Sequence, residues 1–138
     1  MDFGKGLTNG MTHEKGTVLI IDDDLNQNIS IRGALERQRY KVHSVTNYRE
    51  GRRMITEALP DVIVMEAELP DGDGFAFCQE IRGQTAAYIL FLTSRTGNEE
   101  SLEGLRCGGD MYIAKPFHMP ELIVRIDTAM RRLWASNG

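Results

Sequence analysis

Short apolar runs alternate with stretches of helical periodicity along almost the whole chain. The runs are rich in β-branched side chains and predict strands at residues 18–21, 41–45, 61–66, 88–93 and 111–114. Apolar residues at helical spacing predict helices at residues 25–39, 48–59, 75–82, 98–106 and 120–133. Strands that alternate with helices in this way indicate a parallel sheet covered by helices on both faces.

The predicted fold class is α/β, a flavodoxin-like doubly wound (βα)5 sandwich. Right-handed crossovers leave few topologies, and the five-stranded parallel order 2-1-3-4-5 is one of them. Helical spacing also predicts which side chains face the core. These are Ile29, Ala34 and Leu35, then Phe77, Cys78 and Ile81, then Leu102 and Leu105, and finally a stripe of Leu122, Ile123, Ile126, Met130 and Leu133.

The chain of 138 residues has the length of one domain. We expect a flexible lead-in at residues 1–15, the domain itself at 16–133, and a tail or the start of a linker at 134–138, beginning with Trp134. The first residues lack the apolar core of a secretory signal, and no stretch approaches the ~20 apolar residues of a membrane span. Cys78 and Cys107 stand far apart and are expected to be free thiols, as in a reducing cytoplasm.

Composition excludes two broad classes. An apolar fraction of 41% with 26% charged residues is that of a globular chain rather than a disordered one. The net charge is −4, and the only basic doublets are 52–53 and 131–132, so no basic face for direct nucleic-acid binding is expected. His13, His43 and His118 are scattered and share no metal-binding or phosphocarrier motif.

Polar side chains collect where the predicted strands end. Asp22 and Asp23 follow the first strand, Glu66 ends the third, Thr93 ends the fourth, and Lys115 follows the fifth. In an open α/β sheet, ligands bind outside the carboxyl ends of the strands. Three acids with water and a backbone carbonyl can form an octahedral magnesium site, and a lysine with a hydroxyl can bind a phosphoryl oxygen.

In this order, the motifs resemble those of response-regulator receiver domains of two-component signalling. The matching segments are residues 18–24, 69–75, 92–94 and 112–117, and the resemblance covers about Gly16 to Leu133. The resemblance implies that Asp22 and Asp23 bind Mg2+ together with the acceptor side chain and the backbone carbonyl of Glu68. It also implies a switch hydroxyl at Thr93 that moves toward the phosphoryl group, an aromatic partner at Tyr112 that swings inward with it, a phosphoryl-binding Lys115, and a cis peptide bond from Lys115 to Pro116.

The chain departs from this family at the phosphoacceptor position, where the family has aspartate and this sequence has Glu66. The family's aspartate attacks a phosphohistidine as a nucleophile. A glutamate carries its oxygens on the order of 1 Å further out, and a misplacement of that size can cost ~100-fold in rate. The metal site would then be weak or empty.

Three interpretations of Glu66 stay open. Ordinary phosphotransfer is lost, and the domain is a pseudo-receiver that is fixed near one state or controlled by a partner. Alternatively Glu66 is still modified slowly, or Asp71 in the following turn substitutes for it. A glutamate introduced to imitate the activated state would give the same sequence as a natural one.

The resemblance also implies partners and an output surface, and a signalling domain rather than an enzyme. The expected partners are a histidine kinase or phosphotransfer protein and an output domain. The face built from the fourth helix, fifth strand and fifth helix carries Glu99, Glu100, Glu103, Arg106, Met111, Glu121 and Arg125. Met111 and Ser101 replace charged positions of the usual dimer contact, so a monomer or weak homodimer is expected.

The alternative is an enzyme, a small Mg-dependent phosphatase of the haloacid-dehalogenase type. Asp22 would be its nucleophile and Asp24 its acid/base, with Thr93 and Lys115 as further motifs. That family needs another acidic pair after the lysine, and only Glu121 and Asp127 follow, both in the last helical pattern. A flavin or nucleotide carrier would need a glycine-rich phosphate loop after the first strand, which the sequence lacks.

Overall fold

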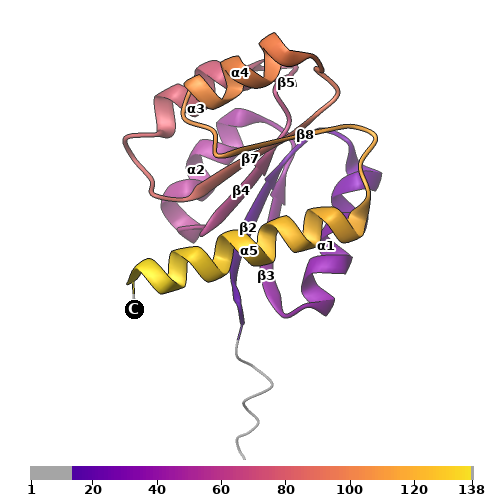
Figure 1. Ribbon diagram of the computed structural model, residues 1–138, viewed down its shortest axis with the longest axis vertical. Coiled ribbons are helices and arrows are strands. Elements are labelled where there is room, and N and C mark those ends of the chain that lie inside the picture. The colour runs from indigo at the N-terminus through magenta and orange to yellow at the C-terminus, as the bar shows by residue number, and fades with distance from the viewer. Residues whose placement is uncertain (1–13, 138) are drawn as a thin grey trace, which may run out of the picture.

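The computed structural model describes residues 14–137 as a five-stranded parallel sheet flanked by five helices (Figure 1). Along the chain the elements are β2 (Gly16–Ile21), α1 (Leu25–Arg37), β3 (Tyr40–Val45), α2 (Tyr48–Ala58), β4 (Val62–Met65), β5 (Glu68–Leu69), β6 (Gly72–Asp73), α3 (Gly74–Ile81), β7 (Tyr88–Thr93), α4 (Asn98–Arg106), β8 (Met111–Ala114) and α5 (Met119–Asn137). The predicted lead-in falls mostly on residues 1–13, which lie outside the described residues, as does His13.

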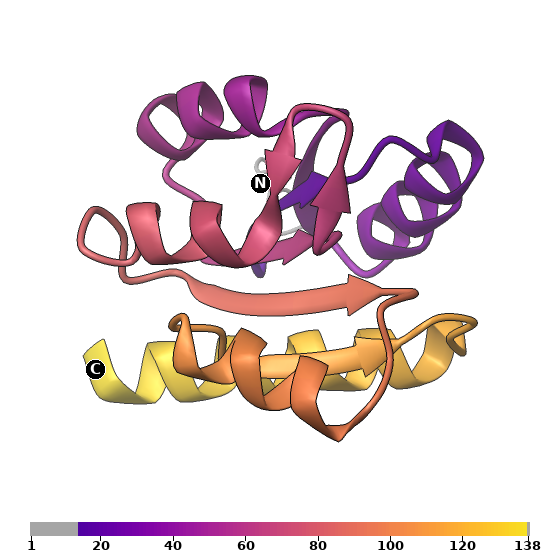
Figure 2. The same ribbon diagram turned by 90° about the horizontal axis from the view of Figure 1, so that it is seen from above.

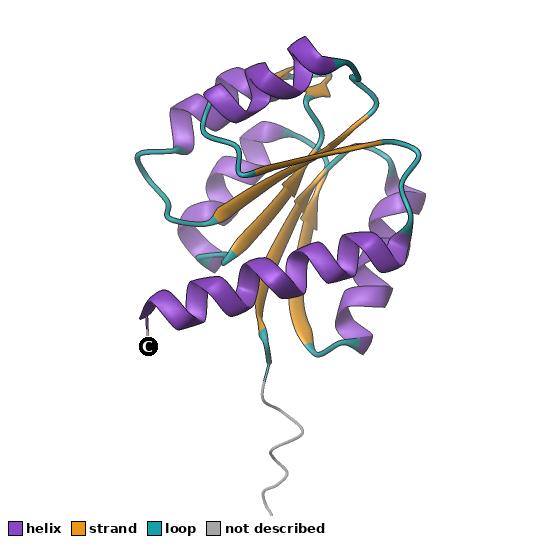
Figure 3. Cartoon of the chain, viewed as in Figure 1, coloured by secondary structure: helices purple, strands orange, loops and turns teal. Residues whose placement is uncertain are grey.

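The strand order is β3-β2-β4-β7-β8, and every neighbouring pair is parallel. Counted along these five strands, the order is 2-1-3-4-5, so the flavodoxin-like prediction is confirmed. The short strands β5 and β6 form a separate antiparallel pair that leads into α3. Helices cover the sheet from both sides (Figure 3).

Alternate residues of each strand supply two separate apolar layers. On one face, Leu19, Ile63 and Ile89 pack among side chains of α2 and α3. On the other face, Val18, Ile20, Val62, Val64, Leu90 and Leu92 pack against α1 and α5. Because both faces are buried, the strands read as continuous apolar runs rather than as alternating ones. The edge strand β8 lies between α4 and α5 (Figure 2).

Three of the predicted inward side chains are exposed instead. Ile29 is 69% exposed, because it lies about 200° around α1 from the buried Ile31. Leu102 and Leu105 are 49% and 44% exposed. Helix α4 approaches the sheet through Gly104, where an added Cβ would lie 3.0–3.1 Å from Tyr112 and Phe75, so the bulkier leucines face outward.

The last helix is longer than predicted. Helix α5 continues to Asn137, so Trp134 lies within it and not just beyond its end. The predicted apolar stripe is present: Leu122, Ile126 and Met130 are buried, and Ile123 and Leu133 pack partly against them. The predicted cis bond between Lys115 and Pro116 is also present.

Candidate functional site

Four of the predicted site residues meet at the carboxyl edge of the sheet. Asp22 and Glu66 each follow directly on a strand, and the last residues of those strands, Ile21 and Met65, are paired in register. Thr93 ends β7 opposite Ala114 of β8, which places Lys115 beside it. Parallel pairing therefore brings two acids, a hydroxyl and an amine to one point.

Lys115 bridges the two buried carboxylates. Its Nζ lies 2.8 Å from Oδ2 of Asp22 and 2.9 Å from Oε1 of Glu66. Asp22 and Glu66 are only 3% and 6% exposed. Burial by itself would lower the pKa of Lys115, but hydrogen bonds to both carboxylates outweigh burial and raise that pKa. The lysine is therefore a fixed cation between two fixed anions.

The second oxygen of Glu66 also has two donors. Oε2 accepts a hydrogen bond from the hydroxyl of Thr93 and another, 2.7 Å long, from the backbone N–H of Ala67. Glu66 thus binds a lysine, a threonine and a backbone amide at once. This is a set of preorganised donors around an anion.

Asp22 is held by Asp24 and by two residues that the sequence did not single out, Gln27 and Asn28. Its Oδ2 accepts a hydrogen bond from Gln27 Nε2 at 2.8 Å, and its Oδ1 accepts one from the Asp24 amide at 3.0 Å. Its backbone carbonyl accepts a hydrogen bond from the buried Asn28 side chain at 2.7 Å. Gln27 and Asn28 belong to no motif, and only helical periodicity from Leu25 onward could have placed them near the strand end.

Two further predicted metal ligands lie in the segments that follow these strands. Asp23 is an exposed residue next to Asp22, and Glu68, whose backbone carbonyl is the predicted ligand, lies in β5 opposite Asp73. Within residues 14–137 the structure brings together no group of three acidic, histidine or cysteine side chains that could hold a metal ion. The oxygen donors suit a hard cation in kind. Their present geometry does not fit one, because Lys115 takes the place between Asp22 and Glu66.

Tyr112 joins the cluster through a residue that sequence reasoning missed, Arg95. The Arg95 amide donates to the Thr93 hydroxyl at 3.1 Å, and the Tyr112 hydroxyl donates to the Arg95 carbonyl at 2.7 Å. The Tyr112 ring packs against Phe91 and Phe75, with ring centroids 5.9 and 6.4 Å apart. Burial raises the pKa of Tyr112, and the charge of Glu100 adds to the effect, so the phenol is a hydrogen-bond donor at neutral pH.

Other side chains fix the loop that follows Glu66. The buried Tyr48 hydroxyl donates to the Glu66 carbonyl at 2.6 Å, and burial, with the charge of Glu66, raises the pKa of this tyrosine. Asp71 accepts from the amides of Tyr48 and Arg49, both at 3.1 Å, at the start of α2. Asp24 caps α1 by accepting from the Gln27 amide at 3.0 Å. Asp71 and Asp24 therefore accept hydrogen bonds from backbone amides at the starts of α2 and α1.

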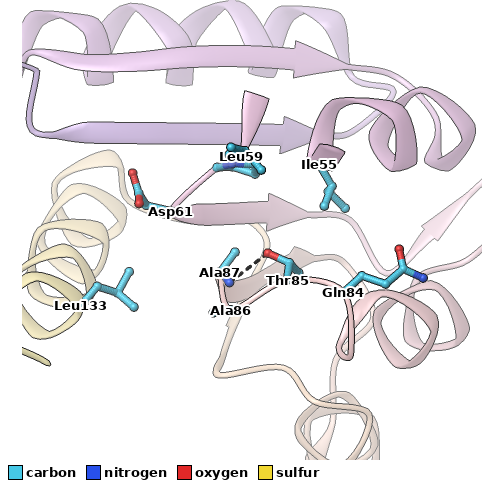
Figure 4. A pocket seen from close by; sticks show the side chains of 9 residues that line it. Ile55, Leu59, Asp61, Gln84, Thr85, Ala86, Ala87 and Leu133 are labelled. Atoms are coloured by element: carbon cyan, nitrogen blue, oxygen red, sulfur yellow. Dashed lines mark hydrogen bonds between the residues drawn. The ribbon is translucent and has the colours of Figure 1, made fainter. Parts of the chain in front are cut away.

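A hollow of about 280 Å3 lies at the opposite end of the sheet (Figure 4). It is lined mainly by apolar side chains from the segments before β4 and β7, including Leu59 and Ala87. Its one acid, Asp61, already accepts a hydrogen bond from the Thr17 amide at 2.9 Å. This hollow carries no group of reactive side chains comparable to the cluster around Lys115.

Comparison with known sequences agrees with the geometry of the strand ends. The profile of the family described as "Response regulator receiver domain" matches residues 18–127. The chain belongs to the response regulator receiver family. A related protein is the transcriptional regulatory protein RprY of Bacteroides fragilis, 36% identical over 121 residues, which are 87% of this chain and 51% of RprY.

A second relative of this receiver domain is the sensory transduction protein BceR of Halalkalibacterium halodurans. It is 31% identical over 116 residues, which are 84% of this chain and 50% of BceR. The receiver domain thus spans about half the length of the curated relatives it matches. Among solved structures, a two-component response regulator from Clostridium difficile superposes with a TM-score of 0.82 at 31% identity, covering 85% of this chain and 97% of that one.

These relatives agree with the receiver interpretation and give no support to the phosphatase alternative. In the receiver domain Asp24, the expected acid/base of a phosphatase, is an exposed helix cap.

Within residues 14–137, no helix combines the length and the apolar character needed to cross a lipid bilayer.

Proposed function

We propose that this receiver domain of a two-component response regulator is atypical, with Glu66 at the phosphoacceptor position and without ordinary aspartyl phosphorylation. The observation that carries the proposal is the threefold engagement of the Glu66 carboxylate by Lys115, Thr93 and the Ala67 amide. A phosphoryl group on an aspartate at this position would use a lysine and a threonine of the same kind. The longer side chain of glutamate puts a negative charge where those donors already point.

We infer further that Glu66 imitates the modified aspartate and holds the domain in an activated-like arrangement. In the family, the switch hydroxyl moves toward the phosphoryl group while its aromatic partner swings inward. Thr93 donates to Glu66, and Tyr112 packs on Phe91 with its hydroxyl on the Arg95 carbonyl. The contact of Thr93 with Glu66 and the packing of Tyr112 on Phe91 support this inference, because both form without any phosphoryl group.

Magnesium binds weakly in this proposal. Asp22, Asp23 and Glu66, with the Glu68 carbonyl, are the ligands that the family implies. Lys115 already neutralises part of the charge of Asp22 and Glu66 at 2.8 and 2.9 Å. A cation would have to displace this lysine and draw in the exposed Asp23, so the net free energy gained by binding the cation is small.

In this proposal the receiver domain transmits its signal through protein–protein contacts. The receiver acts on an output domain or partner through the face of α4, β8 and α5, and a histidine kinase or phosphotransfer protein is its upstream partner. The domain is a cytoplasmic monomer or weak homodimer that contacts neither nucleic acid nor membrane directly. The exposed Leu102 and Leu105 of α4 add apolar surface to this output face.

Labelling with acetyl phosphate and Mg2+ tests the proposal. The parent protein is expected to take up no label, because Glu66 presents its oxygens about one methylene too far out. Glu66→Asp is the matched control, since it restores the length of the family's side chain and is expected to be labelled. Label on Glu66 of the parent, located by mass spectrometry, would overturn the proposal.

The same experiment decides the alternative acceptor. Asp71 accepts two backbone amides of α2, so we expect no label there. If the parent is labelled and Asp71→Asn abolishes the label while Glu66→Gln does not, Asp71 substitutes for the acceptor and the pseudo-receiver proposal is wrong.

A further inference from the structure

The guanidinium of Arg95 is fixed by two helices and one aromatic ring. Its Nε and Nη2 lie 3.1 and 2.9 Å from the two carboxylate oxygens of Glu100, in the first turn of α4. Its Nη1 lies 3.0 Å from Oδ1 of Asp73, the residue that caps α3. Its Cζ lies 4.4 Å above the centre of the Phe75 ring. One side chain therefore joins the start of α3 to the start of α4.

The backbone of the same residue contacts both switch side chains. The Arg95 amide donates to Thr93, and the Arg95 carbonyl accepts from Tyr112. Thr93 in turn donates to Glu66. The path from Glu66 to Tyr112 is thus continuous, and its middle member is the residue with the fixed guanidinium.

The simplest other interpretation of Arg95 is a surface ion pair without consequence. Exposed pairs of that kind are weak, because water screens them and ordering two long side chains costs entropy. The Arg95 side chain is only 29% exposed, its contact with Glu100 is bidentate, and it stacks on an aromatic ring. These features favour one fixed arrangement of the segment after Thr93.

We propose that Arg95 is a positioning residue that couples the Glu66–Thr93 contact to Tyr112. With its guanidinium held by Asp73 and Glu100, the segment after Thr93 has one position, and a change at Thr93 must reach Tyr112. Without the guanidinium, this segment moves independently of α3 and α4, and Tyr112 no longer follows Thr93. This inference rests on the proposed function, in which the state of Thr93 and Tyr112 carries the signal.

A double-mutant cycle read at Tyr112 tests the coupling. The protein is labelled with 3-fluorotyrosine, and the Tyr112 signal among the four tyrosines is assigned with Tyr112→Phe. Thr93→Val removes the hydroxyl and keeps the side-chain shape. We expect Thr93→Val to shift the 19F resonance of Tyr112 in the parent, and to shift it at least threefold less in the Arg95→Gln background.

Arg53→Gln is the matched control. Arg53 also bridges two glutamates, Glu50 at 2.6 Å and Glu57 at 2.9 Å, but on the exposed side of α2. Arg53→Gln should leave the shift that Thr93→Val causes in the Tyr112 resonance unchanged. If Arg95→Gln does not fold by circular dichroism, Glu100→Gln replaces it in the cycle, because it removes one anchor and keeps the arginine. A smaller Thr93→Val shift in that background supports the coupling.

Two results would overturn the role of Arg95. One is a Thr93→Val shift of equal size in the parent and the Arg95→Gln or Glu100→Gln background. The other is a Tyr112 resonance that does not respond to Thr93→Val at all. The acetyl phosphate experiment tests the proposed function separately, so failure of the coupling and failure of the Glu66 proposal give different patterns of results.

Discussion

Lys115→Met offers a direct test of the charge balance at the strand ends. Methionine keeps most of the aliphatic length of lysine and removes the cation, so Asp22 and Glu66 are left as neighbouring buried carboxylates without a counter-ion. Removing one partner of a buried ion pair costs about 3–5 kcal/mol. Lys115 is itself partly exposed, with a side-chain exposure of 18%, and both carboxylates keep other hydrogen bonds. We therefore expect a loss of about 3 kcal/mol in the free energy of unfolding.

This loss is large enough to measure by thermal and urea unfolding followed by circular dichroism. For a chain of 138 residues, the entropy of unfolding at the midpoint is about 290 cal/mol/K, so 3 kcal/mol lowers the midpoint by about 10 °C. Lys41→Met is the matched control, because Lys41 is an exposed residue of β3, and it should change stability by less than about 0.5 kcal/mol.

The double variant Lys115→Met/Glu66→Gln separates charge from packing. If the deficit comes from unpaired carboxylates, removing one of them should recover about half of it. A Lys115→Met protein within about 1 kcal/mol of the parent, or a double variant no more stable than the single one, would refute the reasoning.

Three further predictions concern pH, thiol reactivity and metal binding. Burial, with the charges of Lys41 and Arg32, lowers the pKa of His43 below 6.5, so protonation favours the unfolded chain. The stability of the parent should therefore fall as the pH drops below about 6.5. Thermal midpoints measured from pH 7.5 to 5 should fall less in His43→Gln than in the parent. Burial raises the pKa of Cys78 to about 11 and also raises that of Cys107. Dithionitrobenzoate at pH 8 should therefore react slowly with the thiols of the native protein and rapidly with those of the protein in urea. Fast labelling of the native protein would contradict the buried placement of the two cysteines. If Glu66→Asp binds Mg2+ with a Kd of about 1 mM, 10 mM Mg2+ should stabilise it by about 1.4 kcal/mol, and the parent by less than about 0.5 kcal/mol. Equal stabilisation of the two proteins would argue against competition between Lys115 and Mg2+ for the carboxylates.

The sheet and the strand-end cluster were predictable because both follow from local patterns. Apolar runs with β-branched residues marked the strands, and parallel pairing required Asp22, Glu66, Thr93 and Lys115 to converge once the order was known. The outward positions of Leu102 and Leu105 were not predictable in the same way, because they depend on the close approach of Gly104 to Tyr112.

Arg95 and Tyr48 show why the rest of the site was missed. Both make hydrogen bonds that join a side chain to a backbone atom: the Tyr48 hydroxyl donates to the Glu66 carbonyl, and the Arg95 amide and carbonyl bond the side chains of Thr93 and Tyr112. Such contacts leave no periodicity and no spacing rule in the sequence. The outward orientation of Asp23 likewise depends on the loop at the end of β2, which no pattern of residue types specifies.

The central claim is that Glu66 holds Thr93 and Tyr112 in the activated-like arrangement without any phosphoryl group. The most direct measurement compares backbone amide spectra of three samples: the parent, Glu66→Asp alone, and Glu66→Asp with beryllium trifluoride as a phosphoryl analogue. We expect the signals of residues 93–95 and 111–115 in the parent to match those of the beryllofluoride-bound Glu66→Asp protein. A parent spectrum that matches unmodified Glu66→Asp in these residues would contradict it.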